Sequence, residues 1–286
     1  MTTVFDEDVS LALFTTIGTG GPAALFARPT TIEDLRAALA EAQARGLAVA
    51  VVGNGSNVLA ADDGVDRLVL HLEGALTSVA VDGSMLVAGG GATNAVCLHA
   101  ARAAGLGGFE FACAIPGTAG GGVWMNAGAY GSDWAAILER ALVVTADDER
   151  WLAPDALGLS YRHSALDHGQ VVARVEYRLA RSDPATIRDR VRELVAERKA
   201  TQPTNKRTFG SVFKNPPGEL GAGRMLELCG LKGHRIGGAM ISPKHANFIE
   251  NAGDATTADC IALMDEARRR AREQYGVELQ HEVVLL

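Results

Sequence analysis

The chain has 286 residues, of which 48% are hydrophobic, and its formal net charge is −7. This length suits one large domain or two to three small ones, and the hydrophobic content is typical of a globular chain rather than a disordered one. The acidic balance argues against a general nucleic-acid-binding protein, which would be basic, and an anionic ligand would have to be held by local hydrogen-bond donors.

The sequence shows no pattern that would send the chain to a membrane or across one. Its first ten residues, MTTVFDEDVS, are acidic and lack the apolar core of a signal peptide, and no apolar run approaches the ~18 residues of a membrane-spanning helix. We therefore expect a cytoplasmic protein. The cysteines form no C-x-x-C pair, which favours reduced thiols over disulfides or a metal site at Cys97, Cys113, Cys229 and Cys260.

Helix and strand patterns alternate in the N-terminal part. Residues 30–46 predict a helix with a capping box of Thr30 and Glu33 at its start and Gly46 at its end. Further elements are expected in chain order as a buried strand at 47–53, a strand at 67–72, a hairpin at 77–91 turning at Asp82–Ser84, a helix at 94–105 and a strand at 141–145.

The C-terminal part continues with longer helices. A half-exposed strand is expected at 171–180, an amphipathic helix at 182–200, a polar linker at 201–210, a last helix at 256–276 and a strand at 277–286. This order of elements predicts an α+β chain. Its N-terminal half, up to about residue 200, mixes helices and strands, and a smaller α+β module follows it.

Two glycine-rich loops could approach a ligand closely. In VVGNGSNVLAADDG (51–64), the dinucleotide fingerprint G-x-G-x-x-G would need a glycine where Val58 stands, which argues against a Rossmann site. Either its amides, with Ser56 and Asn57, hold an anion, or it is an ordinary tight turn. The denser IPGTAGGGVWMNAGAYG (115–131) is better explained by close backbone approach to a large planar or phosphorylated ligand.

The stretch FGSVFKNP (209–216) places a hydroxyl, an ammonium and an amide between a glycine and a proline. No histidine stands close in sequence to activate Ser211. By itself, the stretch leaves open whether Ser211 reacts or only caps a turn.

Together these segments resemble the UDP-N-acetylenolpyruvoylglucosamine reductase family, also called UDP-N-acetylmuramate dehydrogenases. The resemblance covers essentially the whole chain through FTTIGTGGPAALFARP (14–29), GNGSN (53–57), the loop 115–131, SYRHS (160–164), FGSVFKNP, ISPKHANFIEN (241–251) and GVELQHEV (276–283). The short interval between Arg162 and Ser211 leaves no room for the tyrosine-bearing loop of the family's longer branch, so the chain looks like the shorter branch.

The resemblance implies an α+β fold with an FAD-binding part of the vanillyl-alcohol oxidase type and a smaller α+β substrate domain. We assign the FAD-binding domain, with two subdomains split near residue 70, to 1–200. The substrate-binding domain is assigned to 201–276, and 277–286 to a strand that returns to the active site.

The resemblance also implies the cofactors. FAD is expected to bind without a covalent bond, because neither flavin loop contains a histidine or cysteine, and NADPH is expected as hydride donor. The expected FAD contacts are Gly53, Asn54, Gly55, Ser56, Asn57, Ile115, Pro116, Gly117, Thr118, Gly120, Gly121, Asn126 and Ala127. No metal is expected.

The family's reaction gives the serine a role. Hydride from the reduced flavin reaches an enolpyruvyl carbon of a UDP-sugar and leaves a carbanion beside a carboxylate. Such a carbanion is basic enough to take a proton from a hydroxyl, so Ser211 needs no histidine and is expected as the acid. Arg162 is expected to face the developing dianion with a fork suited to a carboxylate, and Glu282 matches the family's catalytic glutamate.

Substrate contacts are expected from Tyr130, Lys214, Asn215, Lys244 and His245. The chain departs from the family pattern at Gln280 and His281, which stand where a glutamate and proline are common, at Gln202, often a lysine, and at Ala114, usually a glycine. Glu282 remains in place, but Gln280 and His281 change the local charge beside it.

Two other functions fit the same sequence less well. One is a flavoenzyme of this fold acting on another small acceptor, and the other is a flavin-binding protein without catalysis. The presence of Ser211, Arg162 and Glu282 together argues against both. We expect a monomeric enzyme that makes peptidoglycan precursors from small molecules and binds no nucleic acid.

Overall fold

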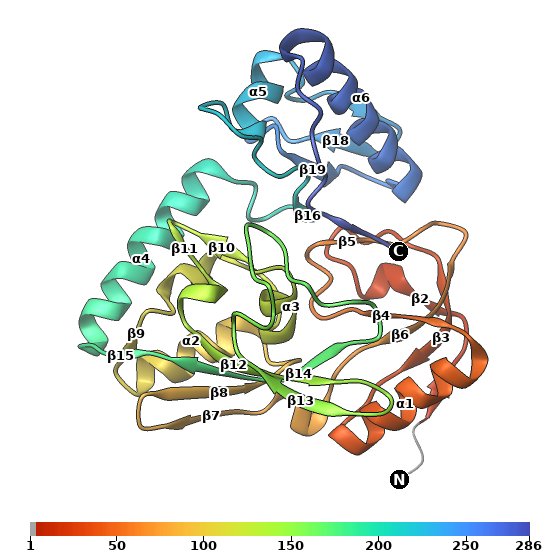
Figure 1. Cartoon of the computed structure of the whole chain (residues 1–286). Coiled ribbons are helices and arrows are strands. Elements are labelled where there is room, and N and C mark those ends of the chain that lie inside the picture. The colour runs from red at the N-terminus through yellow and green to blue at the C-terminus, as the bar shows by residue number, and fades with distance from the viewer. Residues whose placement is uncertain (1–3) are drawn as a thin grey trace. The chain divides into compact units, whose positions relative to one another are not determined.

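A computed structural model describes residues 4–286 (Figure 1). These residues form two compact units. The first unit runs up to Glu7 and includes Leu25–Asn54 and Asp66–Glu197, and the second consists of Asp8–Ala24, Gly55–Val65 and Arg198–Leu286. Two early segments, 8–24 and 55–65, thus belong with the C-terminal residues, although the predicted domain limits placed them before residue 200. Those limits describe functional domains and stay a prediction.

The first unit holds most of the strands. Its helices are α1 (Ile32–Arg45), α2 (Asn94–Ala103), α3 (Ala119–Trp124) and α4 (Pro184–Thr201), of which the last turn from Arg198 belongs to the second unit, and 3-10 turns lie at Gly74–Thr77, Glu110–Ala114 and Trp134–Ala136. Its strands are β1 (Phe5–Asp6), β4 (Ala48–Val51), β6 (Val65–Leu70), β7 (Val79–Asp82), β8 (Met85–Gly89), β9 (Leu106–Gly107), β10 (Gly128–Ala129), β11 (Ser132–Asp133), β12 (Leu138–Val144), β13 (Glu149–Leu152), β14 (Val171–Arg178) and β15 (Ala180–Arg181).

Strand β3 (Pro22–Ala27) begins in the second unit and ends in the first. One sheet has the order β1-β3-β6-β4, with β2 (Val9–Ser10) also paired to β3. A second sheet, entirely within the first unit, has the order β13-β12-β14-β8-β7. The α+β class predicted from the sequence is therefore confirmed.

Helix α1 shows how local side chains set an element's ends. Its capping box is Thr31 with Asp34, where Asp34 N donates to Thr31 Oγ1 at 3.1 Å and Thr31 N donates to Asp34 Oδ2 at 3.2 Å. The predicted box of Thr30 and Glu33 was wrong by one residue, because the Asp34 carboxylate accepts from the hydroxyl of Thr30 as well and becomes the N3 residue. The end at Gly46, with φ +65°, is as predicted.

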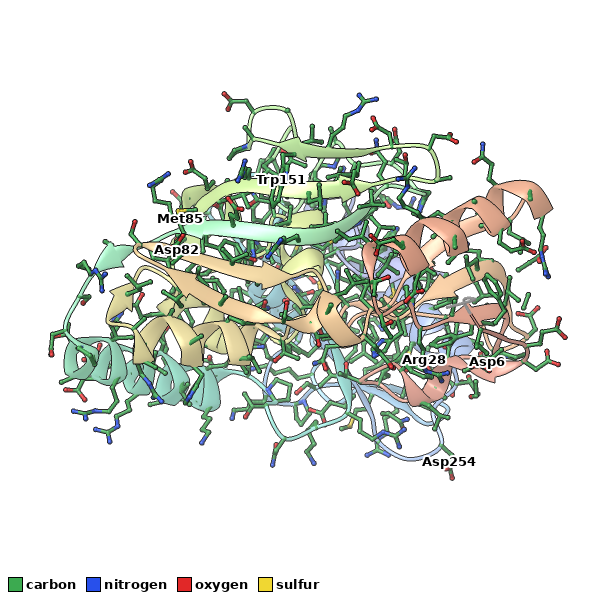
Figure 2. The ribbon with its side chains drawn as sticks, turned by 90° about the horizontal axis from the view of Figure 1, so that it is seen from below. Asp6, Arg28, Asp82, Met85, Trp151 and Asp254 are labelled. Atoms are coloured by element: carbon green, nitrogen blue, oxygen red, sulfur yellow. The ribbon has the colours of Figure 1, made fainter. Side chains whose placement is uncertain are left out.

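The hairpin of β7 and β8 has its turn where the sequence placed it. Asp82 pairs with Met85 around Gly83, whose φ is +59°, and the two side chains lie next to each other in Figure 2. Strand β14 likewise alternates as predicted, with Val175 and Tyr177 buried and Arg178 exposed. The expected helices at 94–105, 182–200 and 256–276 are confirmed as α2, α4 and α6.

The core of the first unit has an aromatic centre. The fully buried Trp134 donates from Nε1 to the hydroxyl of the fully buried Tyr177 at 2.8 Å. Phe109 packs edge-on against both rings, at 6.0 Å from Trp134 and 5.2 Å from Tyr177 between centroids. A second cluster lies under α1 and includes Leu35, Leu68 and Val144.

The second unit combines a four-stranded sheet with two helices, drawn in blue tones in Figure 1. The sheet has the order β16-β19-β18-β17. The elements are β2, a 3-10 turn at Leu11–Leu13, β5 (Val58–Leu59), β16 (Thr208–Ser211), α5 (Ala222–Leu228), β17 (Arg235–Ile236), β18 (Ala239–Ile241), β19 (Phe248–Asn251), α6 (Thr257–Tyr275) and β20 (Val284–Leu285).

The strand predicted at 277–286 is wrong in extent. Only β20 is a regular strand, and it pairs in parallel with β5. Earlier in this segment, His281 makes an isolated bridge to Phe213. The segment divides its backbone hydrogen bonds between two partners, so no long ladder forms.

Further sequence expectations concern single residues and membranes. Cys97, Cys229 and Cys260 are buried and Cys113 is half-buried, and within residues 4–286 none of the four forms a disulfide. Among residues 4–286, no helix is both long and apolar enough to cross a membrane. Within the same residues, no cluster of three His, Cys, Asp or Glu side chains could hold a metal ion.

Candidate active site

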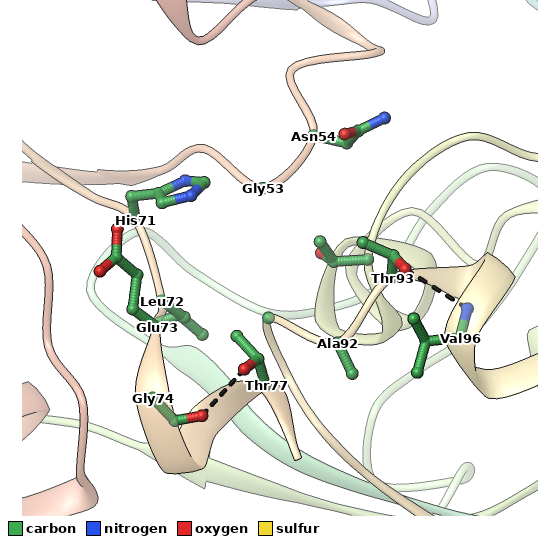
Figure 3. A pocket seen from close by; sticks show the side chains of 12 residues that line it. Gly53, Asn54, His71, Leu72, Glu73, Gly74, Thr77, Ala92, Thr93 and Val96 are labelled. Carbon is green, nitrogen blue, oxygen red and sulfur yellow. Dashed lines mark hydrogen bonds between the residues drawn. The ribbon is translucent and has the colours of Figure 1, made fainter. Parts of the chain in front are cut away.

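The first unit contains a pocket of about 490 Å³. That volume is in the range of small-molecule sites. Figure 3 shows its wall, which comes from the segments after β4, β6 and β8, from the start of α2 and from Thr118 before α3. It is lined by Gly53, Asn54, His71, Leu72, Glu73, Gly74, Thr77, Gly91, Ala92, Thr93, Val96 and Thr118. Three of these residues, Gly53, Asn54 and Thr118, were predicted as FAD contacts.

The first glycine loop offers unused donors at this pocket. Within residues 4–286, the backbone amides of Gly53 and Asn54 donate to no protein acceptor. Gly53 also packs tightly, since a Cβ there would lie 2.6 Å from Thr118 Oγ1. Amides that face a pocket without an internal acceptor suit an anionic group such as a pyrophosphate.

His71 and Glu73 add polar groups that the sequence reasoning missed. His71 Nδ1 lies 2.8 Å from the carbonyl oxygen of Val52. Because a carbonyl only accepts, Nδ1 carries a proton in this contact. Glu73 lies 3.5 Å from the guanidinium of Arg28, which also bonds Asp6 at 2.5 Å (Figure 2). Neither residue stands in a motif, so only the fold could reveal them.

The second glycine loop forms a short helix, α3, capped by Thr118. The two glycines at its start face opposite ways. A Cβ on Gly120 would lie 2.9 Å from the carbonyl oxygen of Gly90 and 3.0 Å from that of Val172, whereas a Cβ on Gly121 would meet only Thr118 Oγ1, at 3.4 Å. Gly120 is buried and Gly121 is exposed. Gly121 therefore offers bare backbone to a ligand, and Gly120 serves the internal packing.

The residues before α3 are bound to the start of α2. Asn94 N donates to Gly117 O at 3.0 Å, and Asn94 Nδ2 donates to Ile115 O at 3.1 Å. The Asn94 side-chain oxygen is buried with no partner in the described chain. Pro116 is exposed in the same turn. An orphaned acceptor and two unused amides in and beside the two glycine loops fit a bound dinucleotide such as FAD.

Asn126 and Ala127 follow α3 and make internal contacts. Asn126 is 2% exposed, and its Nδ2 donates to Ser160 O at 2.9 Å while its Oδ1 accepts from Ala135 N at 3.0 Å. Ala127 N donates to Gly122 O at 2.9 Å. The side chain of Asn126 thus holds the loop that carries Arg162, and its predicted FAD contact stays a prediction.

Arg162 lies in a backbone conformation that is rare for its type. Its φ is +53°, and Asn126 and Tyr130, on the loop that supports it, have φ of +39° and +55°. Its guanidinium donates to Gly128 O at 2.6 Å and lies 5.0 Å from the ring centre of Tyr161. Left-handed non-glycine residues often gather where function demands a particular geometry.

Tyr130 was predicted to bind substrate. Its hydroxyl donates to Leu194 O of α4 at 3.0 Å, so the phenol links the β10–β11 hairpin to a helix. A substrate contact by Tyr130 stays a prediction.

Ser211 ends β16 in the second unit, opposite Phe248 of β19. Gly210, with φ +81°, lies in the irregular register between Thr208 and Ser211, and this irregularity breaks the ladder just before the serine. In the described chain, the Ser211 hydroxyl has no hydrogen-bond partner. It therefore caps no turn, and this favours the reactive interpretation of FGSVFKNP over the structural one.

Glu282 contacts residues 211–214, called the serine segment below, through its backbone. Its amide donates to Val212 O at 2.8 Å, and its carbonyl accepts from Asn57 Nδ2 at 3.1 Å. Ser211 and Glu282 are thus close together in the second unit, as the resemblance implied, although more than sixty positions apart in sequence. Arg162 belongs to the first unit.

The end of the first glycine loop belongs to the second unit. Gly55 needs its φ of +60°, and a Cβ there would lie 1.8 Å from Phe14 O. Ser56 O lies 3.1 Å from the position that a Cβ on Gly210 would take. Gly55, Ser56 and Asn57 therefore adjoin the serine segment, whereas Gly53 and Asn54 line the pocket.

The predicted substrate residues of the second unit differ in their surroundings. Lys214 is half-buried, and its ammonium has no partner in the described chain. Asn215 accepts from Ala222 N at 3.0 Å and so supports the start of α5. The ammonium of Lys244 contacts Lys199 O. Of these two lysines, Lys214 is the one whose ammonium has no partner among the described residues, and its predicted substrate contact stays a prediction.

His245 packs against its neighbours. Its ring lies 5.0 Å from that of Phe248, and Asn247 N donates to its Nδ1 at 3.2 Å. Burial, with a smaller contribution from Lys232, lowers the pKa of His245 below its usual value. The ring is therefore a neutral packing group in this structure, and its predicted substrate role stays a prediction.

Comparisons with known proteins match two family models and many curated relatives. Residues 202–286 match the family model described as "UDP-N-acetylenolpyruvoylglucosamine reductase, C-terminal domain", and residues 23–152 match the one described as "FAD binding domain". A reductase of this name from Symbiobacterium thermophilum is 44% identical over 94% of this chain and 88% of its own length. Another, from Anaeromyxobacter dehalogenans, is 44% identical over 98% of this chain and 85% of its own length.

A solved structure gives the same result for the fold. The crystal structure of UDP-N-acetylenolpyruvylglucosamine reductase from Thermus caldophilus superposes with a TM-score of 0.86 and 36% identity, covering 99% of both chains. The predicted fold class and the predicted FAD cofactor are confirmed by these matches. Similarity along nearly the full length, in both matched domains, shows that the chain belongs to the UDP-N-acetylenolpyruvoylglucosamine reductase family of FAD-dependent oxidoreductases.

Proposed function

We propose that the protein reduces UDP-N-acetylglucosamine enolpyruvate to UDP-N-acetylmuramate, with NADPH as hydride donor, in the synthesis of peptidoglycan precursors. The observation that carries the proposal is the Ser211 hydroxyl, which has no hydrogen-bond partner in the described chain and whose segment is bonded to that of Glu282.

When bound, FAD would supply the redox chemistry that passes hydride from NADPH to the enolpyruvyl double bond. The residues of the first unit that would hold FAD are Gly53, Asn54 and Thr118 at the pocket, with Gly121 at the start of α3. Their unused amides and bare glycine backbone support this assignment. FAD is held without a covalent bond, so acid precipitation should leave all flavin in the supernatant.

Ser211 gives its proton to the substrate carbon beside the carboxylate. A hydroxyl in a hydrogen bond as donor would first have to break it, and Ser211 has no such bond to break. The carbanion is the stronger base by far, so transfer is downhill, and the serine regains a proton from solvent before the next turnover. Glu282 supplies a carboxylate beside this segment.

Arg162 stabilises the negative charge that develops on the substrate. Its guanidinium is oriented by Gly128 O, and its planar fork matches a carboxylate. Lys214, whose ammonium is unpaired in the described chain, binds an anionic part of the UDP-sugar. We further propose that the enzyme acts as a monomer in the cytoplasm on small-molecule substrates alone.

Ser211→Ala tests the proposal. Stopped-flow absorbance separates bleaching of the flavin by NADPH from recovery of its colour with the enolpyruvyl UDP-sugar without oxygen. Bleaching needs no proton from Ser211 and should keep its wild-type rate, whereas recovery should slow about 10²- to 10⁴-fold, the usual effect of a positioned acid. Equal slowing of both steps would give Ser211 a structural role, and unchanged recovery would assign the proton to another group.

A further inference from the structure

We propose that Asn247, a residue in no predicted role, is a positioning residue that sets the direction of the Ser211 hydroxyl. The inference rests on the proposed function, since it concerns the proton that Ser211 gives. Asn247 is 4% exposed and lies just before β19, in the second unit with Ser211.

The Asn247 side chain takes the place of a strand residue beside Phe213. Its Oδ1 accepts from Phe213 N at 2.9 Å, and its Nδ2 donates to Phe213 O at 2.8 Å. Its own carbonyl accepts from Val212 N at 2.9 Å. The two residues directly after Ser211 are therefore held on this side by Asn247.

The opposite side of the same segment is held by the C-terminal residues. Lys214 N donates to Gln280 O at 2.9 Å, and Glu282 N donates to Val212 O at 2.8 Å. Residues 212–214 are clamped between Asn247 and 280–282. The clamp also fixes Glu282 against the serine segment.

The position of Ser211 depends on this clamp because its own side chain makes no hydrogen bond to the described residues. The hydroxyl has no partner in the described chain, and the irregular register at Gly210 interrupts the ladder before it. The pairing of Ser211 with Phe248 and the backbone that follows are left to define where the oxygen points. Proton transfer is sensitive to such placement, since an error of ~1 Å can slow a reaction about 10²-fold.

An asparagine suits the task because its amide has the donor and acceptor of a peptide group. Aspartate keeps the shape and the acceptor but lacks the donor to Phe213 O, and alanine loses both. Each change should leave the fold standing, because the strand pairs of β19 with β16 and β18 do not use this side chain.

Asn251 provides a matched control at the other end of β19. Its Nδ2 donates to Ile17 O at 3.0 Å, and its Oδ1 accepts from Gly253 N at 3.1 Å and Ala255 N at 3.2 Å. Its loss removes a comparable set of hydrogen bonds from the same unit without touching residues 211–214. The Asn251 variant therefore separates a general loss of stability from a loss of Ser211 positioning.

The experiment measures both flavin steps in Asn247→Asp, Asn247→Ala and Asn251→Ala. Asn247 variants should bleach with NADPH at the wild-type rate and recover with the enolpyruvyl UDP-sugar about 10- to 100-fold more slowly. Asn251→Ala should lower the melting temperature to a similar extent and recover near the wild-type rate. Equal recovery rates in the Asn247 and Asn251 variants, or slowed bleaching, would overturn the inference.

A double-mutant cycle identifies the residue through which Asn247 acts. Adding Asn247→Asp to Ser211→Ala should slow recovery no further, because a missing hydroxyl cannot be misplaced. Full additivity would overturn the inference while leaving Ser211 as the acid. If Ser211→Ala alone recovers at the wild-type rate, the proposed acid is wrong, and the role of Asn247 falls with it.

Discussion

Replacing Gly121 by alanine should separate cofactor binding from folding, because the two effects have opposite signs. The new methyl group would touch only Thr118 Oγ1, at 3.4 Å, an ordinary contact, and would otherwise project from the exposed side of α3. Alanine also favours a helix over glycine by about 0.8–1.0 kcal/mol. The flavin-free protein should therefore be unchanged or slightly more stable.

FAD binding should weaken in the same variant. If the flavin approaches the bare backbone of Gly121, a methyl group between them must displace it, and such overpacking costs about 1–3 kcal/mol. At about 1.4 kcal/mol for each factor of ten, the dissociation constant should rise about 5- to 150-fold. The neighbouring Gly120→Ala should instead destabilise the fold, since its methyl group would lie 2.9 Å from Gly90 O.

The assay has two readouts on flavin-free protein. Thermal unfolding by circular dichroism reports the fold, and quenching of flavin fluorescence during titration reports FAD affinity. Wild-type affinity in Gly121→Ala would refute the assignment of this loop face to FAD. A strong loss of thermal stability in the same variant would refute the local packing on which the reasoning depends.

Two further predictions concern stability. Tyr177→Phe should lower the free energy of unfolding by about 1–3 kcal/mol, because the buried Nε1 of Trp134 loses its acceptor, and urea titration would contradict this if the midpoint stayed unchanged. Arg269 and, less strongly, Arg270 lower the pKa of Glu266 from 4.5 to about 2, so this carboxylate stabilises the fold above about pH 4.5 and its contribution disappears as the pH falls through about 2. Glu266→Gln should flatten the pH dependence of the urea midpoint between pH 5 and 2, and an unchanged slope would count against the ion pairs.

Local sequence patterns predicted many of the helices, strands and turns. Gly46 and Gly83 mark a helix end and a turn because glycine adopts a positive φ at little cost. Strand β14 is recognisable because apolar and charged residues alternate along it. The N-cap of α1 was off by one residue because threonines stand at both 30 and 31 and only the geometry of Asp34 decides between them. Helix α3 was missed because three consecutive glycines have low helix propensity, and internal acceptors override it.

The site was less visible than the fold. Ser211 and Glu282 could be named only through a family resemblance, because residues far apart in sequence meet through backbone hydrogen bonds that no local pattern encodes. His71 and Asn247 had no signal at all, since a lone histidine or asparagine is usually an ordinary surface or packing residue. Asn126 and Asn215 look like ligand residues in glycine- and proline-rich stretches, yet both use their side chains to support the protein's own backbone.

The order in which the ribosome makes the chain separates the two units in time. Every residue of the pocket lies before position 119, and the last segment of the first unit ends at Glu197. The second unit is built from three segments that are distant in sequence, and Leu286 forms backbone hydrogen bonds with Leu59 and Ala61 of an early segment. Ile17 and Leu59 are buried in the folded protein. Their burial therefore requires residues that are synthesised much later. Because domains fold as units during synthesis, the first unit and its pocket can form before the chain can hold Ser211 in place.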